Sequence, residues 1–457
     1  MIKNEQIIGA IDIGTTKIVT VIGKKNDNGK LEILSMSKTE SRGVKRGVVQ
    51  NIEETVAAIS KTVQEAEQKA GVKLQEVFVG IAGQHIRSIK NRGYINRDNY
   101  EYEITRDDIK SLENDMRKVP VDIGEEIIHV IPQSYIVDNE TGVNPVGMSG
   151  RRLEANFHIV IAQTASAKNI EKCVNRVGLK VKNLILEPLA SSESVLTADE
   201  KEAGVALVDI GGGTTDIAVY YDDIIRHTAV IPFGGNVITK DIKEGCAILQ
   251  RQAELLKMQF GSALGDMAED DKVVSIAGIA GRDPKEISFK SLAYIIQSRM
   301  EEILDSVIFE IENSGYMDKL SAGIVITGGG AMLRHLPQLV KFRSCMDVRI
   351  GYPNEHLAVN ASTEINLPMY STAVGLVLKG FEYIDERKEI SENKLFKQIE
   401  NDILIGENSN KQEEAEIEVN NSVNENKKNA GGKNKPGIFD SFKKSFSELF
   451  EENDSKM

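Results

Sequence analysis

An acidic residue followed closely by glycine, threonine and lysine is suited to binding a phosphate together with a metal ion. The segment "IGAIDIGTTKIVTVI" (8–22) has this composition at its centre, in Asp12, Gly14, Thr15, Thr16 and Lys17. Glycine lets backbone N–H groups approach an anion closely, and threonine hydroxyls add further donors. Lys17 adds a positive charge that can reach a phosphate oxygen. This segment is therefore a candidate phosphate-binding loop.

The segment "GVALVDIGGGTTDIAVY" (204–220) repeats the same order of residue types. Its acid is Asp209, and the loop that follows contains Gly211, Gly212, Gly213, Thr214 and Thr215. A carboxylate repels a phosphate, so an acid beside such a loop becomes useful when a divalent cation lies between the two. Mg²⁺ keeps several waters and prefers sites made of carboxylates and phosphates. Asp12 and Asp209 are therefore predicted to hold the waters of a Mg²⁺ that bridges the β- and γ-phosphates of a nucleotide.

A third glycine-rich loop occurs late in the chain, in "AGIVITGGGAML" (322–333). It is predicted to be a buried strand, then Gly328, Gly329 and Gly330, then the start of a helix with a positive N-terminus. Glycine there lets a flat nucleoside lie against the backbone. The chain contains neither a Walker A motif nor G-x-G-x-x-G, so P-loop and Rossmann sites are not expected.

The elements that must position these loops follow from the apolar pattern. Buried runs on both sides of each acidic loop predict two β-hairpins with phosphate-sized tips. Residues 51–71 predict a helix that ends at a glycine, and residues 235–261 predict two helices. Alternating strands and helices indicate the α/β class. Residues 84–162 have mixed signals, and residues 234–322 are mainly helical.

Length and charge limit the other possibilities. A chain of 457 residues is long enough for two or three folding units. Its net charge of −13 makes general nucleic-acid binding unlikely, since phosphate backbones favour basic proteins. Three dispersed cysteines indicate reduced thiols in a cytosolic compartment. The N-terminus is expected to carry no signal peptide, and no run approaches the length of a membrane-spanning helix.

The last seventy residues differ from the rest. From about Arg387 the chain is rich in Asn, Glu and Lys, which predicts a disordered linker. Residues 437–450 then predict an amphipathic helix, whose apolar stripe contains Ile438, Phe439, Phe442, Phe446, Leu449 and Phe450. The stripe can pack on the protein itself, on a partner groove, or on a membrane surface. The length of the linker argues against packing on its own domain and favours a membrane.

Together, "IDIGTTK", "VDIGGGTTD" and "ITGGGAML" resemble the two phosphate loops and the adenosine loop of the actin/Hsp70/sugar-kinase ATPase superfamily. Further segments, such as "VGIAGQHIRSIKNRG" and "NPVGMSGRRLEANFHIV", resemble the FtsA cell-division proteins. The resemblance covers residues 1 to about 383 and resumes at the C-terminal helix. It implies an actin-like (ribonuclease H-like) two-lobed ATPase fold with an inserted α+β subdomain, then a disordered linker and a C-terminal amphipathic helix.

The resemblance also implies an organisation and a function. Its expected parts are a first lobe core (1–83 and 163–195), an inserted subdomain (84–162), a second lobe core (196–233 and 323–383), a helical lobe (234–322), a linker (384–436) and a membrane helix (437–450). The implied protein binds ATP and Mg²⁺, forms filaments and binds the C-terminal peptide of FtsZ. It tethers FtsZ to the cytoplasmic face of the membrane at the division septum, together with other division proteins.

The roles of some site residues rest only on this resemblance. Glu254 and Lys257 match a pair that reaches the nucleoside, and the alternative is a surface ion pair. Glu187 matches a polar group near the attacking water, and the alternative is a glutamate that merely starts a helix before Pro188.

The resemblance also implies which residues bind a partner. Arg282, Lys285 and Arg299 match positions that contact the FtsZ peptide, and the alternative is ordinary solvated basic residues. Two other functions stay open: a sugar kinase, which needs an aspartate base and a sugar-binding lobe, and an Hsp70-like chaperone, which needs a β-rich substrate domain. At most a weak ATPase activity is expected, since hydrolysis depends on a water held in line with the phosphate.

Overall fold

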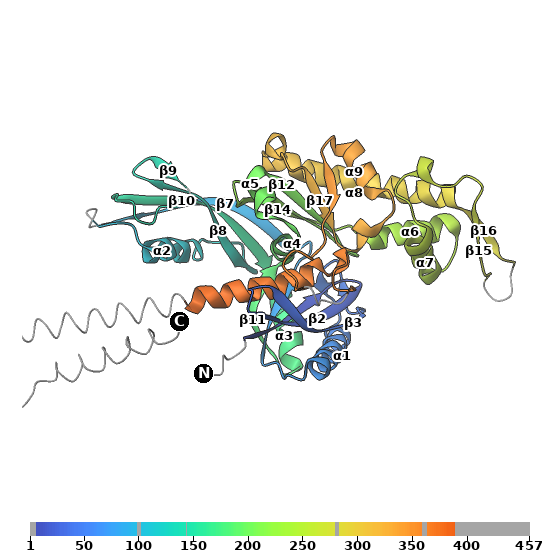
Figure 1. The fold of residues 1–457 in the computed structure, drawn as a ribbon, viewed down its shortest axis with the longest axis horizontal. Coiled ribbons are helices and arrows are strands. Elements are labelled where there is room, and N and C mark those ends of the chain that lie inside the picture. Colours follow the sequence, from blue (N-terminus) through green and yellow to red (C-terminus); the bar gives the residue numbers. More distant parts are fainter. Residues whose placement is uncertain (1–5, 98–101, 143, 279–282, 359–362, 389–457) are drawn as a thin grey trace, which may run out of the picture. The chain divides into compact units, whose positions relative to one another are not determined.

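The computed structural model describes residues 6–97, 102–142, 144–278, 283–358 and 363–388. The chain divides into two units, Met1–Asp385 and Glu386–Met457, and nearly all of the second lies outside the described residues. The same is true of the predicted linker beyond residue 388, of the C-terminal helix with its six apolar residues, and of Arg282. The first unit has the α/β architecture that the sequence predicts (Figure 1).

The first lobe is built on a five-stranded sheet with the first hairpin inside it. In spatial order its strands are β11 (Lys180–Leu186), β6 (Glu76–Ile81), β1 (Ile7–Ile13), β2 (Lys17–Lys25) and β3 (Leu31–Glu40). β1 and β2 are antiparallel and paired up to Ile13 and Ile18, so residues 14–16 form the hairpin tip. A short hairpin of β4 (Val44–Lys45) and β5 (Val48–Val49) follows β3.

Helices cover both faces of this sheet because apolar residues alternate along its strands. Ile11 and Ile13 of β1 pack on one face with α1 (Ile52–Ala70) and α3 (Thr164–Arg176). Ile8 and Ala10 pack on the other face with a helix of residues 371–388, called here the 371–388 helix. As predicted, α1 ends at a glycine, since Gly71 has the left-handed backbone of a helix C-cap.

The second lobe repeats this arrangement around the second hairpin. Its strands are β14 (Ile224–Ile231), β13 (Thr215–Tyr221), β12 (Val205–Ile210), β17 (Ile324–Thr327) and β18 (Val348–Ile350). β12 and β13 are antiparallel and paired up to Ile210 and Thr215, and β17 runs parallel to β12 as β6 does to β1. The two predicted hairpins are therefore confirmed, and they occupy equivalent places in two similar sheets.

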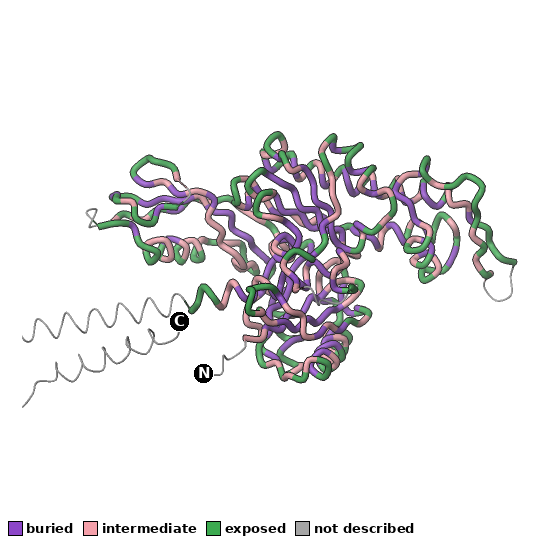
Figure 2. The backbone as a smooth tube through the Cα atoms, in the orientation of Figure 1, coloured by how far each residue is buried: buried purple, intermediate pink, exposed green. Residues whose placement is uncertain are grey.

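The helices of the second lobe also lie on both faces of its sheet. On one face, β12 and β13 share a core with α6 (Gly235–Cys246), α7 (Gln250–Phe260), α8 (Phe289–Ser314) and α9 (Leu336–Ser344). On the other face they pack with Val195 at the end of α4 (Glu187–Val195), which is followed by α5 (Ala198–Ala203). Figure 2 shows the strands of both sheets buried between these layers. Short 3₁₀ turns occur at Gly265–Met267, Met317–Lys319, Gly329–Met332 and Pro368–Tyr370.

A separate four-stranded sheet lies between β6 and α3 in the sequence. Its order is β7 (Ile86–Asn96), β10 (Arg152–Gln163), β8 (Glu125–Val137) and β9 (Glu140–Gly142), and α2 (Arg106–Met116) shares a core with it. Thr105 and Asp108 form a capping box that starts α2. This sheet and helix form the inserted subdomain that the sequence predicts.

Two local predictions need correction. The glycines after β17 enter a 3₁₀ turn instead of an α-helix, and α9 begins only at Leu336, where Pro337 suits a first helical turn. The mainly helical segment also contains a hairpin of β15 (Val273–Ile276) and β16 (Lys285–Ser288), which flanks the glycine-rich interruption. These strands are too short for an alternating pattern to stand out.

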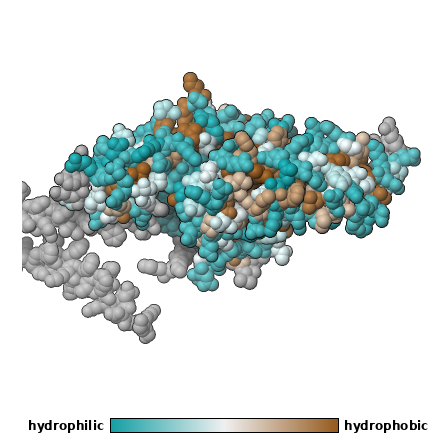
Figure 3. Space-filling model, turned by 90° about the horizontal axis from the view of Figure 1, so that it is seen from above, coloured by the Kyte–Doolittle hydropathy of each residue, from teal (hydrophilic) through white to brown (hydrophobic). Residues whose placement is uncertain are grey.

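One face of the molecule shows how polar and apolar residues are distributed on the surface. On the face shown in Figure 3, hydrophilic residues predominate and hydrophobic residues gather in small groups. None of the helices within the described ranges combines the length and the apolar character that crossing a membrane requires.

Candidate nucleotide-binding site

The tips of the two hairpins touch each other. Added side-chain carbons at Gly212 and Gly213 would overlap Thr16 and Thr15, respectively. Only glycine permits this approach, so the glycines of the second loop are required by the threonines of the first. The structure thus brings together the two phosphate-type loops that the sequence predicts.

The first loop carries one acid and one base. Asp12 is buried at the end of β1, and Lys17 starts β2 on the other side of the tip. Lys17 Nζ donates to the carbonyl oxygen of Met369 (2.7 Å) and lies over the ring of Tyr370. Burial raises the pKa of Asp12 to about 6, although the charge of Lys17 opposes this and that of Asp209 adds to it.

The second loop carries an acid that is held by hydroxyl groups. Ser191 and Thr372 both donate to one carboxylate oxygen of Asp209, at 2.6 and 3.1 Å. The two hydroxyls come from α4 and from the 371–388 helix and are 3.0 Å apart. Burial still raises the pKa of Asp209, against the effect of these donors and of Lys17.

Asp216 is a further acid at this site, and the sequence analysis assigned it no role. It follows the second loop, and Thr214 Oγ1 donates to its Oδ2 (2.9 Å). Its Oδ1 is buried without a hydrogen-bond partner. Burial and then the charge of Asp209 raise its pKa to about 8. The sequence contained a sign of this role, since Asp216 is the last residue of the glycine-rich segment "VDIGGGTTD". Ser191 and Thr372 do not lie in any such motif.

Glu187 lies among the same charges. It is the first residue of α4, as its alternative interpretation expected, and it also interacts electrostatically with Asp12, Asp216 and Lys17. Burial, and then the neighbouring carboxylates, raise its pKa well above the usual value. The structure therefore places Glu187 beside the two loops, and its catalytic role stays a prediction.

The third glycine loop packs against the strand that carries Asp209. Gly328 has a positive φ of 81°, and a side-chain carbon there would overlap Asp209 Oδ1. A side-chain carbon at Gly330 would overlap Ile210, whereas Gly329 has only a loose neighbour in Met369. This loop therefore lies next to the second phosphate loop.

Glu254 and Lys257 also lie beside the second loop. Their side chains form an ion pair of 2.8 Å on α7, and Lys257 Nζ also donates to Gly235 O (3.0 Å) and Thr239 Oγ1 (2.8 Å). Gly235 in turn donates its N–H to Gly211 O (2.9 Å). The Lys257 side chain is only 14% exposed, so the pair is more than an ordinary surface ion pair.

The described residues of this site suit a magnesium–polyphosphate. Four buried or partly buried carboxyl groups each have a raised pKa, and the charge of Lys17 acts on three of them, those of Asp12, Glu187 and Asp209. Such an excess of acid favours a bound cation, which would also give the unpartnered Asp216 Oδ1 a source of hydrogen bonds. Within the described ranges no three His, Cys, Asp or Glu side chains are placed to hold an ion directly.

Family models match two parts of the chain. One described as "SHS2 domain inserted in FTSA" matches residues 83–161, and one described as "Cell division protein FtsA" matches residues 206–375. The cell division protein FtsA of Pseudomonas aeruginosa is 41% identical over 384 residues, which cover 83% of this chain and 91% of that protein. The chain belongs to the FtsA family. The FtsA of Escherichia coli strain K12 is 37% identical over 393 residues, covering 84% of this chain and 92% of that protein.

Solved structures of low sequence identity support the actin-like fold. The PilM–PilN type IV pilus biogenesis complex contains a chain of 15% identity and TM-score 0.61, with 82% of this chain and 98% of that chain covered. MreB5 of Spiroplasma citri bound to ADP gives a TM-score of 0.50 at 16% identity, with 84% and 98% covered. Membership of the FtsA family makes the chain an actin-like cell-division protein, rather than a sugar kinase or an Hsp70-like chaperone.

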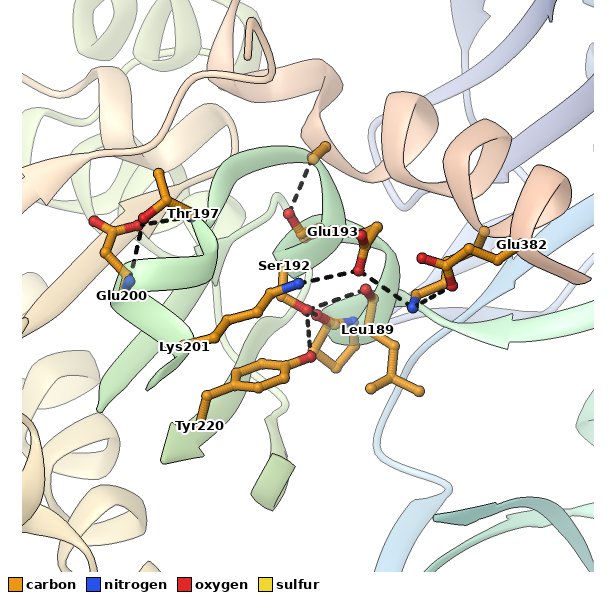
Figure 4. A network of polar contacts seen from close by, with 12 residues as sticks. Leu189, Ser192, Glu193, Thr197, Glu200, Lys201, Tyr220 and Glu382 are labelled. Atoms are coloured by element: carbon orange, nitrogen blue, oxygen red, sulfur yellow. Dashed lines mark hydrogen bonds and ion pairs between the residues drawn. The ribbon is translucent and has the colours of Figure 1, made fainter. Parts of the chain in front are cut away.

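In this FtsA-family chain, the two helices behind the site are tied together by ion pairs. Lys379 of the 371–388 helix contacts Glu193 of α4 (3.2 Å) and Glu382 (2.7 Å), and Lys201 also contacts Glu193 (3.1 Å) (Figure 4). Burial alone would raise the pKa of Glu193, but the positive charges of Lys379 and Lys201 lower it to about 2. Next to these ion pairs, Ser192 of α4 also forms a hydrogen bond with the hydroxyl of Tyr220 on β13 (2.7 Å). The helices that supply Ser191 and Thr372 are thus held in a fixed relation.

The predicted partner residues within the described part border α6. Lys285 Nζ donates to the carbonyl oxygens of Cys246 and Ala247 at the end of that helix. Arg299 pairs with Asp241 of α6 and with Glu302. The structure therefore gives both residues partners within the chain.

Proposed function

We propose that this FtsA-family protein binds Mg·ATP between its two hairpin loops. The observation that carries the proposal is the contact between the loop tips at Thr15–Gly213 and Thr16–Gly212, with buried acids and Lys17 behind them. Lys17 and the loop N–H groups would bind the phosphates, while Asp12 and Asp209 would hold the waters of the Mg²⁺. When bound, the Mg²⁺ would neutralise charge on both the phosphates and the carboxylates.

The other site residues have separate roles in this proposal. The third glycine loop (328–330) supports the nucleoside, and Glu254 and Lys257 approach it from the helical lobe. Glu187 would order a water near the terminal phosphate, and any ATPase activity would depend on it. A weak ATPase is the most that is proposed, because four acids around one lysine suit binding of a cation more clearly than activation of a water.

We also propose that the protein forms filaments and tethers FtsZ to the cytoplasmic face of the membrane at the septum. The FtsA relatives in Pseudomonas aeruginosa and Escherichia coli are cell division proteins, which supports this role. The C-terminal peptide of FtsZ would bind the helical lobe (234–322) near Arg282, Lys285 and Arg299. For Lys285 and Arg299 this requires exchange of the internal partners described above.

The membrane contact is proposed for residues 437–450. In a helix, Phe439, Phe442, Phe446 and Phe450 share one stripe, and burial of each contributes roughly 2 kcal/mol. A single short helix binds weakly, so filaments would strengthen the attachment through avidity.

Electron microscopy on lipid monolayers tests the whole function. Filaments are expected with Mg·ATP, and an FtsZ tail peptide is expected to bind to them. Liposome co-sedimentation with and without residues 437–457 tests the anchor separately, and equal sedimentation of the two chains would refute it. Charge reversal at Arg299 should weaken binding of the FtsZ peptide. Nucleotide-independent assembly would contradict the proposed control by ATP.

A further inference from the structure

The inserted subdomain reaches the first residue of α4 through one side chain. His129, on β8 of the insert, accepts a hydrogen bond at Nε2 from the backbone N–H of Leu186 (3.0 Å). Leu186 is the last residue of β11, and Glu187 follows it directly as the first residue of α4. The contact therefore links the insert to the peptide group between Ile185 and Leu186, one residue before Glu187.

This hydrogen bond holds the residue that precedes the first turn of α4. Leu186 occupies the N-cap position of α4 and has no side-chain oxygen, and the helix has no side-chain capping hydrogen bond. Position 186 is thus fixed partly by a residue 57 positions away in the sequence. A side chain at that distance can transmit a displacement of the insert to the start of α4.

The chemistry of His129 suits a permanent acceptor. An imidazole accepts at Nε2 only when it is neutral and its proton is on Nδ1. Burial, and then the positive charges of Arg117 and Lys379, lower the pKa of His129 to about 4. The ring is therefore neutral at physiological pH and keeps its acceptor.

The strand that carries His129 is itself attached to the second lobe. Four residues further along β8, the side-chain amide of Gln133 donates to the carbonyls of Ile225 and Arg226 on β14, at 3.0 and 3.1 Å. Arg226 returns a hydrogen bond to Gln133 O (3.1 Å). On the neighbouring strand, His158 Nε2 pairs with Thr228 Oγ1 (2.8 Å). The position of His129 is thus set by the contact between the insert and β14.

We propose that His129 is a positioning residue that fixes Glu187 and makes its place in the nucleotide site depend on how the inserted subdomain sits on β14. This inference rests on the proposed function, because it assumes that Glu187 faces the terminal phosphate of ATP. Binding energies between coupled sites are reciprocal. Mg·ATP should therefore strengthen the contact between the insert and β14, just as that contact orders Glu187.

Two substitutions separate the hydrogen bond from simple packing. His129→Leu keeps an apolar body of similar size and removes the acceptor, whereas His129→Gln keeps an acceptor oxygen near the position of Nε2. Amide exchange at Leu186 is measured first, without nucleotide. His129→Leu is expected to raise this exchange rate at least tenfold, and His129→Gln should leave it near that of the unsubstituted chain. Unchanged exchange in His129→Leu would overturn the proposal.

The second measurement compares Mg·ATP and Mg·ADP affinities. His129→Leu should weaken Mg·ATP binding three- to tenfold and Mg·ADP binding less than twofold, with His129→Gln close to the unsubstituted chain. In a Glu187→Gln background, His129→Leu should have no further effect, because both changes act on the same group. Additive effects, or equal losses for ATP and ADP, would refute positioning through Glu187.

The two measurements also separate this inference from the proposed function. If the unsubstituted chain binds no nucleotide, the proposed function fails, and the Leu186 exchange rate still decides whether His129 fixes the start of α4. If the chain binds Mg·ATP and His129→Leu binds it equally well, only the role of His129 is lost.

Discussion

The two hairpin loops have nearly the same sequence and the same place in their sheets, yet they differ in charge. The first loop contains one acid, Asp12, and one base, Lys17, so the charges of the loop nearly cancel. The second loop has Asp209 and Asp216 and no basic residue of its own, and hydroxyl groups of Ser191 and Thr214 donate to its acids.

This difference indicates a division of work between the loops. Lys17 gives the first loop an attraction for phosphate, whereas the second loop attracts a cation. Neither loop alone suits a magnesium–polyphosphate, which carries both signs of charge. The contact between the tips, through Thr15 and Gly213, is what makes one site of two unlike halves.

The largest expected effect comes from separating the tips. In Gly213→Val the new side chain would overlap Thr15, so the loops must move apart. Overpacking of this kind costs about 1–3 kcal/mol of unfolding free energy, and nucleotide binding should fall beyond detection. Gly142→Val is the matched control, because nothing lies within 4 Å of a side-chain carbon there. Calorimetric titration with Mg·ATP and chemical denaturation measure the two effects. Full binding by Gly213→Val would show that the tips need not touch.

The next effect comes from removing the charge of the first loop. Lys17→Met should weaken Mg·ATP binding by about 1.5–3 kcal/mol, which is roughly ten- to hundredfold, because a charge-assisted hydrogen bond to phosphate is lost. Lys38→Met is the control: Lys38 also lies over the Tyr370 ring, but it is exposed and pairs with Glu364. Titration with Mg·ATP should show less than a twofold change for Lys38→Met. Equal losses in both variants would assign the effect to the Tyr370 ring.

The third effect, which is the smallest for a change of one pH unit, distinguishes the acids of the two loops by pH. A carboxyl group whose pKa is raised by folding keeps its proton in the folded chain and loses it in the unfolded chain, so its contribution to stability declines as pH rises between the two pKa values. The folded pKa is about 8 for Asp216 and about 6 for Asp12. The free energy of unfolding of Asp216→Asn, relative to that of the unsubstituted chain, should rise by about 1 kcal/mol per pH unit from pH 5 to 8.

Asp12→Asn provides the comparison for that experiment. The rise in its relative free energy of unfolding should level off above about pH 6, because Asp12 is then ionised in both the folded and the unfolded chain. Urea denaturation at half-unit pH intervals without nucleotide or Mg²⁺ checks both variants. Identical pH profiles would mean that the two loops do not differ in the way their charges suggest.

Much of the fold was predictable because its signals are local. A hairpin needs only two apolar runs around a turn, and α1 needs only its helical periodicity and Gly71, so both were found. β15 and β16 were missed because each has only four residues. The α-helix expected after Gly330 was wrong because the chain first makes a 3₁₀ turn.

The sequence by itself determined the two hairpins, the acids at their strand ends, the inserted subdomain and the family. Each of these can be recognised from short continuous segments of the chain. Only the tertiary structure decided which distant groups complete the site. Thr372 reaches Asp209 across 163 positions, and Lys17 reaches the Met369 carbonyl across 352. Such contacts depend on how two sheets and two crossing helices pack, and no periodicity along the chain encodes that packing.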